Sequence, residues 1–465
     1  MIGQALLKEF QKVLGKENVF GDETDRLTYS YDAAVLDPVI PAIVLRPETS
    51  EALGAAVRLC NENSLPLTVR GAGTNLSGGV IPKSNGVVLL TNALNRILEI
   101  NEEDLYAVVQ PGVVTARLAA AVEAKGLFYP PDPGSQAVST LGGNVAENAG
   151  GLRGLRYGVT RDYVMGLNFF DVNGELVKTG GRTVKCVTGY NLAGLMVGSE
   201  GTLGVFNEII LKLIPMPAAR KAMIAVFNDM GRTSETVAGI IANRILPVTL
   251  EIMDNCTIRA VEDFSHVGLP LDAAALLLIE VDGHPVQVEE DAAKVESLCR
   301  QLGAVHIRIA RDAAERDKVW EARRAALSAL AKLRPTLVLE DATVPRSRIP
   351  AMIDAINGIA KEYGLTIGTF GHAGDGNLHP TILTDRRDKE EWGRVERAVD
   401  AIFDRALKLG GTLSGEHGIG IAKSRFMEKE VGKSTLLYSH RIKCALDPKG
   451  ILNAGKIIGE APCTT

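Results

Sequence analysis

Three glycine-rich loops within residues 70–205 constrain the N-terminal half of this chain more than any other feature. The first follows a β-rich run and covers 70–79; the others lie at 130–151 and 198–205. Glycines at such turns let backbone N–H groups point inward and approach an anion closely. One such loop is equally well explained as a tight surface turn. Three loops rich in Ser, Thr and Asn instead predict an extended ligand lying across a backbone surface.

The first loop does not match the common nucleotide-binding motifs. Leu76 stands where a Gly-x-Gly-x-x-Gly fingerprint has its third glycine, and no Lys-Ser/Thr pair follows as in a P-loop. Neither a Rossmann fold nor a P-loop fold is therefore indicated.

Composition excludes several classes of function. The net charge of −5 and the pI near 5.9 argue against nucleic acid as a partner, because phosphate binding needs a basic footprint. The N-terminus lacks the pattern of a signal peptide, and the apolar runs are far shorter than the ~18 residues of a membrane-spanning helix. We therefore expect no transmembrane segment and a cytoplasmic location, with peripheral membrane attachment through a partner left open.

The chain changes character along its length, and its 465 residues allow two or three domains at about 150 residues each. We expect a helical segment at 1–35, a glycine-loop domain at 36–216, a second domain at 217–434 and a C-terminal tail at 435–465. The boundary near 216 rests on the sequence Pro215-Met216-Pro217.

Helix and strand patterns distinguish the two domains. The first reads β-α-β, with a strand at 43–45, a helix with Ser50 as its N-cap, and a strand at 67–69. In the second, strands alternate with helical patterns, which are expected at 233–244, 288–302, 312–332, 349–363 and 389–409. Antiparallel sheets backed by helices fit this alternation.

The segment 371–380 holds two of the seven histidines and is typical of a tight hairpin. If Asp375-Gly376 forms a two-residue turn, His372 lies opposite His379 on one sheet face, with Cβ atoms roughly 5 Å apart. Two imidazoles so placed could bind one transition-metal ion. The alternative is a hydrogen-bonded pair of histidines with a purely structural role.

Glu416 and His417 lie between glycines about forty residues further on. Neighbours in extended chain point in opposite directions, so we expect Glu416 to serve a metal ion and His417 to face the reacting proton. Alternatively, Glu416 caps the next helix.

These motifs, in this order, resemble the FAD-binding family of vanillyl-alcohol oxidase and p-cresol methylhydroxylase. The second half, with His372, His379, Glu416 and His417, resembles the branch of glycolate oxidase D-subunits, D-lactate dehydrogenases and D-2-hydroxyglutarate dehydrogenase. The resemblance implies an α+β fold: a two-subdomain FAD-binding domain of the p-cresol methylhydroxylase type, a ferredoxin-like antiparallel-sheet cap domain, and a C-terminal helical tail returning to the FAD domain.

The resemblance also implies how FAD is held. The pyrophosphate would lie on the first loop, and the residues implied in FAD binding are Arg70, Gly71, Ala72, Gly73, Thr74, Asn75, Ser77, Pro131, Ser135, Thr140, Gly142, Gly143, Asn144, Gly201, Val205 and Asn453. Some family members attach the flavin through a histidine of the first loop. Thr74 stands there, and no histidine precedes His266. We therefore expect non-covalent FAD.

By resemblance, His372, His379 and Glu416 bind a divalent metal (zinc, iron or manganese), and His417 is the general base. Arg323, in Trp320-Glu-Ala-Arg-Arg, would bind the substrate carboxylate by bidentate hydrogen bonds; the alternative is an exposed helix arginine.

The implied reaction is oxidation of a small D-2-hydroxy acid, D-lactate or glycolate, to the 2-oxo acid. Hydride would pass to flavin N5, and electrons onward to an iron–sulfur subunit or an electron-transferring flavoprotein. Leu339 stands roughly where the D-2-hydroxyglutarate branch has a lysine, and Thr381 replaces a family asparagine; both differences favour a monocarboxylate. The alternatives are an FAD-binding electron-relay subunit and an alkylglycerone-phosphate synthase-like transferase.

Overall fold

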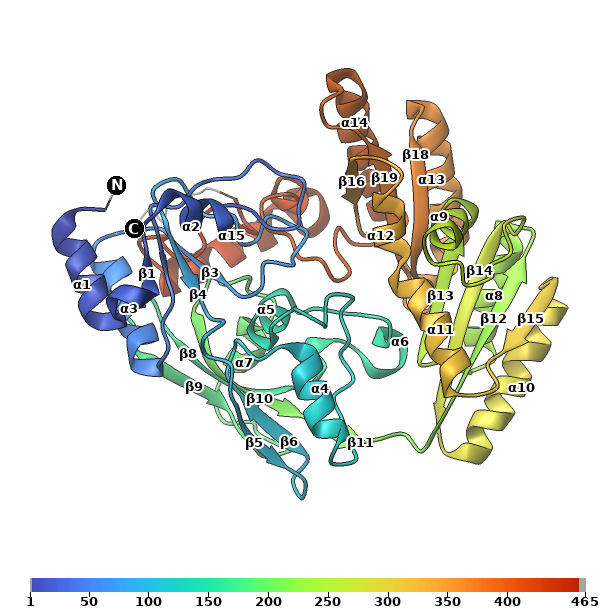
Figure 1. The fold of residues 1–465 in the computed structure, drawn as a ribbon, viewed down its shortest axis with the longest axis horizontal. Coiled ribbons are helices and arrows are strands. Elements are labelled where there is room, and N and C mark those ends of the chain that lie inside the picture. Colours follow the sequence, from blue (N-terminus) through green and yellow to red (C-terminus); the bar gives the residue numbers. More distant parts are fainter. Residues whose placement is uncertain (1, 460–465) are drawn as a thin grey trace. The chain divides into compact units, whose positions relative to one another are not determined.

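The computed structural model describes residues 2–459, whose contacts divide them into two compact units (Figure 1). The first unit comprises residues 2–149, 159–216 and 416–459, and the second comprises 150–158 and 217–415. The expected cap domain reached residue 434, whereas the chain already rejoins the first unit at residue 416. The mixture of helices and antiparallel sheets confirms the predicted α+β class.

The first unit contains one sheet with strand order β1-β2-β4-β3 and another with order β5-β6-β10-β8-β9. Its strands are β1 Val19–Phe20, β2 Ile43–Leu45, β3 Leu67–Arg70, β4 Val87–Leu90, β5 Ile97–Asn101, β6 Tyr106–Val109, β7 Leu127–Phe128, β8 Val164–Phe170, β9 Leu176–Gly180, β10 Val205–Lys212 and β11 Ile214–Pro215. Its helices are α1 Gln4–Leu14, α2 Glu23–Thr28, α3 Ser50–Glu62, α4 Thr115–Glu123, α5 Leu141–Glu147, α7 Leu192–Met196 and α15 Met427–Leu446, with short 3-10 turns η1 Lys16–Asn18, η2 Thr160–Asp162 and η4 Ser424–Phe426.

Local sequence explains how the glycine loops are positioned in this unit. Helix α3 places Leu53, Val57 and Cys60 on one face, at helical spacing, and buries them against the sheet in which β2 and β3 flank β4 in parallel. Strand β3 then ends at Arg70, immediately before the first loop. The second loop leads into α5, whose N-cap Thr140 accepts a hydrogen bond from the Gly143 N–H at 3.3 Å.

The second unit is organised by one antiparallel sheet with strand order β15-β12-β14-β13-β18-β19-β16, to which β17 adds by pairing with β19. Its strands are β12 Ala219–Phe227, β13 Thr249–Asp254, β14 Ala275–Gly283, β15 His306–Ile309, β16 Thr336–Leu339, β17 Ala342–Thr343, β18 Thr366–His372 and β19 Asn377–Thr384. Its helices are α6 Gly154–Tyr157, α8 Met230–Ala242, α9 Asn255–Ser265, α10 Pro285–Gln301, α11 Ala313–Arg324, α12 Ala326–Ala331, α13 Ile349–Tyr363 and α14 Lys389–Lys408, with η3 Arg346–Arg348.

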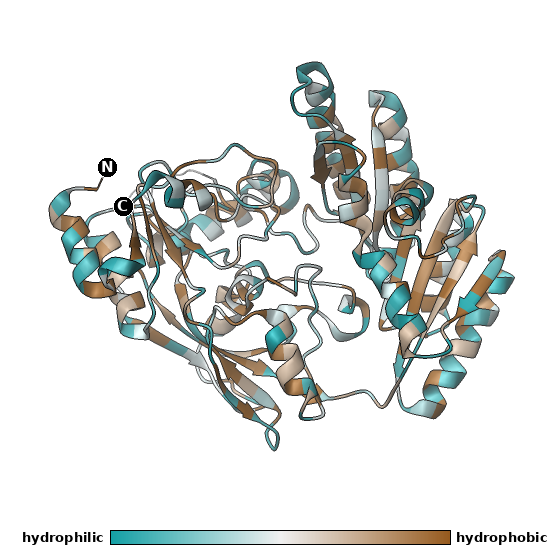
Figure 2. Ribbon diagram, viewed as in Figure 1, coloured by the Kyte–Doolittle hydropathy of each residue, from teal (hydrophilic) through white to brown (hydrophobic). Residues whose placement is uncertain are grey.

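Helices cover this sheet, whose strands are mainly apolar while α10 and α14 carry many polar residues (Figure 2). Helices α9, α11 and α12 pack on the face to which Met253 and Phe370 point, and these form one apolar core. Helices α8 and α10 also pack on β12 and β14. The core under α9, α11 and α12 borders the candidate site described below.

Several predicted boundaries need correction. The predicted helix 312–332 is two helices, α11 and α12, which meet at Ala325. The N-cap of α3 is Thr49 rather than Ser50, because Thr49 is extended and its side chain accepts from the Ala52 N–H at 3.2 Å. Residue 435 lies inside α15, which kinks at Gly432. Helix α13 coincides with the predicted 349–363.

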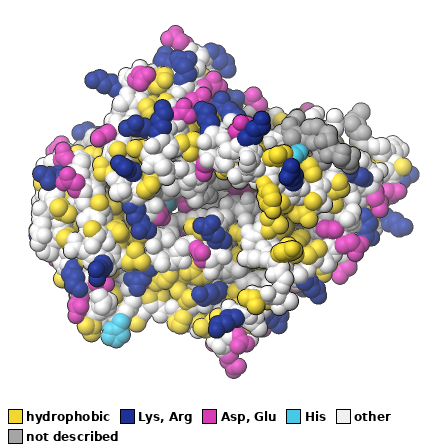
Figure 3. Space-filling view, turned by 180° about the vertical axis from the view of Figure 1, so that it is seen from behind, with side chains coloured by type: hydrophobic (Ala, Val, Ile, Leu, Met, Phe, Trp, Pro, Cys, Tyr) yellow, Lys and Arg dark blue, Asp and Glu magenta, His cyan; other side chains and the backbone are white. Residues whose placement is uncertain are grey.

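Membrane insertion of a helix has no support in the described part of the chain. Within residues 2–459, no helix combines the length and the apolar composition needed to cross a membrane. On the face drawn in Figure 3, basic and acidic side chains are interspersed.

A buried lysine and aspartate fix the C-terminal segment to the first unit. Lys443 Nζ donates to Asp447 Oδ2 at 2.5 Å and to the carbonyl oxygens of Thr202 and Leu452, each at 2.7 Å. Asp447, which is fully buried, also accepts from the Leu452 N–H at 2.7 Å. Leu452 forms a parallel bridge with Leu67 of β3, so the ion pair holds this segment at the edge of the sheet.

We expect Lys443→Met to lower the free energy of unfolding by about 3–5 kcal/mol, because it leaves the Asp447 carboxylate buried without its cation. Urea unfolding followed by circular dichroism measures this change. As a control, Lys429→Met removes an exposed lysine from the same helix and should change stability by less than about 0.5 kcal/mol. Equal losses in both variants would contradict a specific role for the buried pair.

Candidate functional site

The histidine hairpin of the second unit forms with a different register from the one predicted. His372 lies opposite Asn377, and His379 lies opposite Phe370. A two-residue turn would need positive φ at both Asp375 and Gly376, but only Gly376 has it, at 93°. The connection is therefore four residues long, and the N–H groups of Asp375 and Gly376 both point to the His372 carbonyl oxygen.

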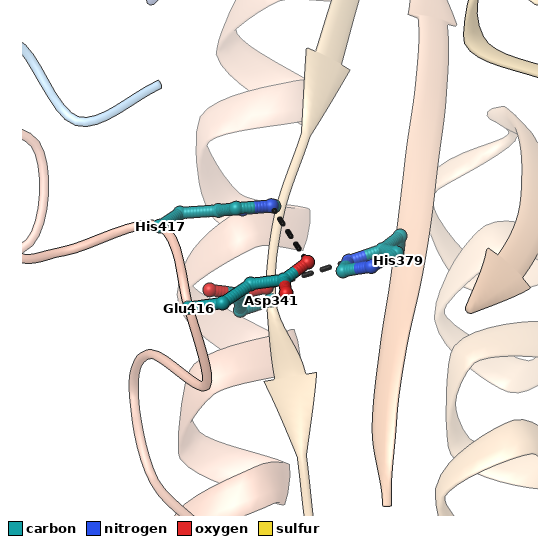
Figure 4. A group of neighbouring side chains, drawn as sticks. All are labelled: Asp341, His379, Glu416 and His417. Atoms are coloured by element: carbon teal, nitrogen blue, oxygen red, sulfur yellow. Dashed lines mark ion pairs between the residues drawn. The ribbon is translucent and has the colours of Figure 1, made fainter. Parts of the chain in front are cut away.

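The two histidines nevertheless share a sheet face, as diagonal rather than direct neighbours. Their rings are buried, perpendicular, and 5.0 Å apart between centroids. Each ring has a carboxylate beside Nδ1. Glu251 Oε1 lies 2.7 Å from Nδ1 of His372. Asp341 Oδ1 lies 3.4 Å from Nδ1 of His379 (Figure 4). A carboxylate beside Nδ1 is the usual partner of a histidine that binds a metal through Nε2.

Glu251 also binds Arg323, so one carboxylate joins two of the predicted site residues. The Nε and Nη2 atoms of Arg323 lie 2.7 Å and 2.6 Å from Glu251 Oε2, and the guanidinium stacks 4.7 Å from the centroid of the Phe370 ring. Burial raises the pKa of Glu251, but the charges of His372 and Arg323 outweigh it and hold the pKa below its ordinary value. Arg323 is thus a buried, ion-paired residue rather than an exposed helix arginine.

Asp341, a second residue that sequence reasoning did not select, joins the hairpin to the segment before Glu416. This fully buried carboxylate accepts hydrogen bonds from Asn377 Nδ2 at 3.3 Å and from Ser414 Oγ at 2.9 Å. Ser414 precedes Glu416 by two residues. The sequence signal for both missed acids is a charged residue inside an apolar strand pattern: Glu251 in Thr-Leu-Glu-Ile-Met, and Asp341 after Leu-Val-Leu-Glu.

Glu416 and His417 belong to the first unit, where they lie side by side rather than pointing in opposite directions. His417 Nε2 is 3.6 Å from Glu416 Oε1, and both side chains are largely buried (Figure 4). The expectation of opposite directions assumed extended backbone, but this segment bends and contains Gly418 at a φ of 79°. The side-chain directions therefore do not separate the two roles, and the division into ligand and base rests on the chemistry of the two groups.

The glycine loops of the first unit border a cavity of about 670 Å³. Of the predicted cofactor residues, it is lined by Arg70, Gly71, Ala72, Gly73 and Thr140. A Cβ at Gly71 would lie 2.3 Å from Thr140 Oγ1, so the close approach of the two loops requires glycine there. Asn453 lines a second cavity of about 590 Å³.

The remaining predicted cofactor residues line neither of these two cavities; they are Thr74, Asn75, Ser77, Pro131, Ser135, Gly142, Gly143, Asn144, Gly201 and Val205. Ser77 Oγ and Asn453 Oδ1 are buried without a hydrogen-bond partner in the described structure. The Ser77 hydroxyl, beside a glycine cradle, can donate to a phosphate-bearing ligand such as FAD, whereas Asn453 Oδ1 can only accept and would need an N–H or O–H donor.

Comparison with known proteins identifies the two regions. Residues 41–180 match the family described as FAD binding domain, and residues 216–457 match FAD linked oxidases, C-terminal domain. The chain is 48% identical to the glycolate oxidase subunit GlcD of Bacillus subtilis (strain 168), over 99% of this chain and 98% of that protein. It is 34% identical to a D-lactate dehydrogenase of Anaerostipes hadrus, over 97% of each.

The fold has a known counterpart in a crystal structure of p-cresol methylhydroxylase with substrate bound. The TM-score is 0.80 at 18% identity, covering 99% of this chain and 98% of that one, a likeness of fold alone. Together with the family matches, it confirms the resemblance stated from the sequence. The chain belongs to the FAD-linked oxidases, as a flavoprotein oxidoreductase close to glycolate oxidase subunits and D-lactate dehydrogenases.

Proposed function

We propose that this chain oxidises a small D-2-hydroxy acid, D-lactate or glycolate, to the 2-oxo acid. The observation that carries the proposal is the buried Glu251 carboxylate, which binds both His372 and Arg323. A histidine suited to a metal and a guanidinium suited to a carboxylate are thereby held together. In a 2-hydroxy acid the hydroxyl and the carboxylate are on neighbouring carbons, so one molecule could contact both groups.

The residues present fit a divalent metal. His372, His379 and Glu416 would hold it, with Asp341 beside His379 as a further carboxylate, and such imidazole–carboxylate sets suit zinc, iron or manganese. When bound, the metal would supply a Lewis acid that lowers the pKa of the substrate hydroxyl, and FAD would supply the hydride acceptor at N5.

Protein side chains would perform the remaining tasks. His417 would accept the hydroxyl proton, since imidazole is the side chain whose ordinary pKa lies nearest neutrality. Nε and Nη2 of Arg323 contact Glu251, so the substrate carboxylate would bind the remaining N–H groups on Nη1 and Nη2, which can still donate two hydrogen bonds.

The hairpin also supports a monocarboxylate substrate. Leu339 of β16 lies directly opposite Thr381 of β19, two residues from His379 on the same sheet face. Thr381 is fully buried, and its hydroxyl donates to the His379 carbonyl oxygen at 3.3 Å. An apolar side chain and a satisfied hydroxyl at these two positions offer no cation to a second carboxylate.

Electrons would leave through another protein. The relative in Bacillus subtilis is named as a subunit, which supports assembly with an iron–sulfur subunit or transfer to an electron-transferring flavoprotein. An electron-relay subunit without its own substrate is the second candidate.

Anaerobic mixing with D-lactate or glycolate should bleach the flavin absorbance of the FAD- and metal-loaded protein, whereas L-lactate should be far slower. A panel of D- and L-2-hydroxy acids and D-2-hydroxyglutarate in a stopped-flow spectrometer provides the measurement. Absence of bleaching by every acid would favour the relay.

We expect His417→Ala to slow flavin reduction by about 10²–10⁴-fold, the usual contribution of a general base. The oxidised flavin spectrum should persist, because His417 is not among the predicted FAD-binding residues. His306→Ala, which removes an exposed histidine of β15, is the matched control and should react at the normal rate. Near-normal reduction in His417→Ala would remove this residue from the role of base.

Glu251→Gln should weaken metal binding by about 10–100-fold, because a partner that orients a ligating histidine typically contributes that much. His379→Ala should weaken metal binding further, because His379 would be a direct ligand of the metal. Glu280→Gln is the control, since this buried glutamate of the same sheet binds Trp320 Nε1 at 2.5 Å instead of a histidine. Metal titration and elemental analysis measure occupancy, and full occupancy in His379→Ala would refute the ligand assignment.

A further inference from the structure

Two acidic residues on the glycine loops of the first unit have no part in the proposed chemistry. Glu147 ends α5 in the second loop, and its Oε2 is enclosed without a hydrogen-bond partner in the described structure. Glu200 lies in the third loop, is 6% exposed, and has a φ of 50°, which is uncommon for a residue with a side chain. A buried acid in an unfavourable backbone conformation needs a compensating interaction.

The compensating interaction of Glu200 is with the segment that follows His417. Its Oε1 accepts a hydrogen bond from the Ile419 N–H at 2.7 Å, and its Oε2 accepts one from the Gly420 N–H at 2.7 Å. Both bonds are short and charge-assisted, which makes them stronger than bonds between neutral groups. Each carboxylate oxygen therefore holds one backbone amide within three residues of His417.

A second set of contacts binds the same segment to the first glycine loop. The Ser77 carbonyl oxygen accepts from the N–H groups of Ile421 and Ala422, at 2.9 Å and 3.0 Å. The segment carrying His417 is thus attached to the loop at 70–79 through Ser77 and to the loop at 198–205 through Glu200.

Burial and the neighbouring charges act on the pKa of both carboxyls. Burial raises the pKa of both carboxyls, and that of Glu147 further, with the charges of Glu200 and Asp32 adding to the effect. Glu200 is favoured in the charged form by its two N–H donors and by the nearby Lys423 and Lys456. The charged form of Glu200 is the one that accepts both backbone hydrogen bonds most strongly.

We infer that Glu200 is a positioning residue, whose carboxylate holds the 416–420 segment and thereby sets His417 relative to the FAD-binding loops of its own unit. The inference rests on the proposed role of His417 as base. It concerns hydrogen bonding to backbone, so the bonds themselves are testable without turnover.

The test compares Glu200→Gln with Glu147→Gln in the FAD- and metal-loaded protein. A glutamine at 200 turns an NH₂ group toward one of the two backbone N–H donors, whereas a glutamine at 147 keeps the shape of the side chain and leaves both Glu200 hydrogen bonds in place. Residue-resolved amide hydrogen exchange should show the Ile419 and Gly420 amides protected in the wild type and at least about tenfold faster in Glu200→Gln. Flavin reduction should fall about 10–100-fold in that variant at nearly unchanged KM.

Glu147→Gln should match the wild type in both measurements. Gly418→Ala should speed exchange even with Glu200 present, because a φ of 79° is unfavourable for alanine and its Cβ would also crowd Glu147 Oε2. Rapid exchange of both amides in the wild type, or equal effects of the two glutamine variants, would overturn the inference. If Glu200→Gln does not fold, the inference is tested by amide exchange of Ile419 and Gly420 in the wild type and in Gly418→Ala. Normal turnover of His417→Ala beside protected amides would instead refute only the base assignment.

Discussion

A carboxylate withdrawn from water must be met by cations or by hydrogen-bond donors, and this requirement organises the functional residues of both units. In the second unit, the Glu251 carboxylate pairs with the Arg323 guanidinium and the His372 imidazole, and so joins α11 to the hairpin. In the first unit, Glu200 is met by two backbone amides and Asp447 by Lys443. Glu251 and Glu200 each hold a segment distant in sequence, and the Asp447–Lys443 pair does so through the Lys443 contact with the Thr202 carbonyl oxygen.

Features that depend on neighbouring residues could be predicted from the sequence. The strand before Gly71, helix α13 and the β-rich runs around 371–380 follow from glycine placement and apolar periodicity, which are local properties. The resemblance then supplied the fold and the cofactor, because loop order and spacing specify them together. What local pattern could not supply was the backbone conformation inside the turns.

The errors came from that missing conformation and from long-range pairing. The hairpin register depended on φ at Asp375, which the Asp-Gly pair alone does not determine. The relation of Glu416 to His417 depended on a bend at 415–418. Glu251 was overlooked because its partner Arg323 lies 72 residues away. The apolar pattern around Glu251 marks a charged residue in a buried strand, but it does not identify the residue that pairs with it.

The division of the chain between Gly415 and Glu416 has a consequence for how this protein can diversify. The guanidinium, the histidine hairpin and the Leu339–Thr381 pair belong to the second unit, whereas the cofactor loops and His417 belong to the first. Under the proposed function, substitutions in the second unit could adapt the protein to another acid while the glycine loops, Glu416 and His417 keep their sequence. The sequences of the two units would then diverge at different rates within one gene.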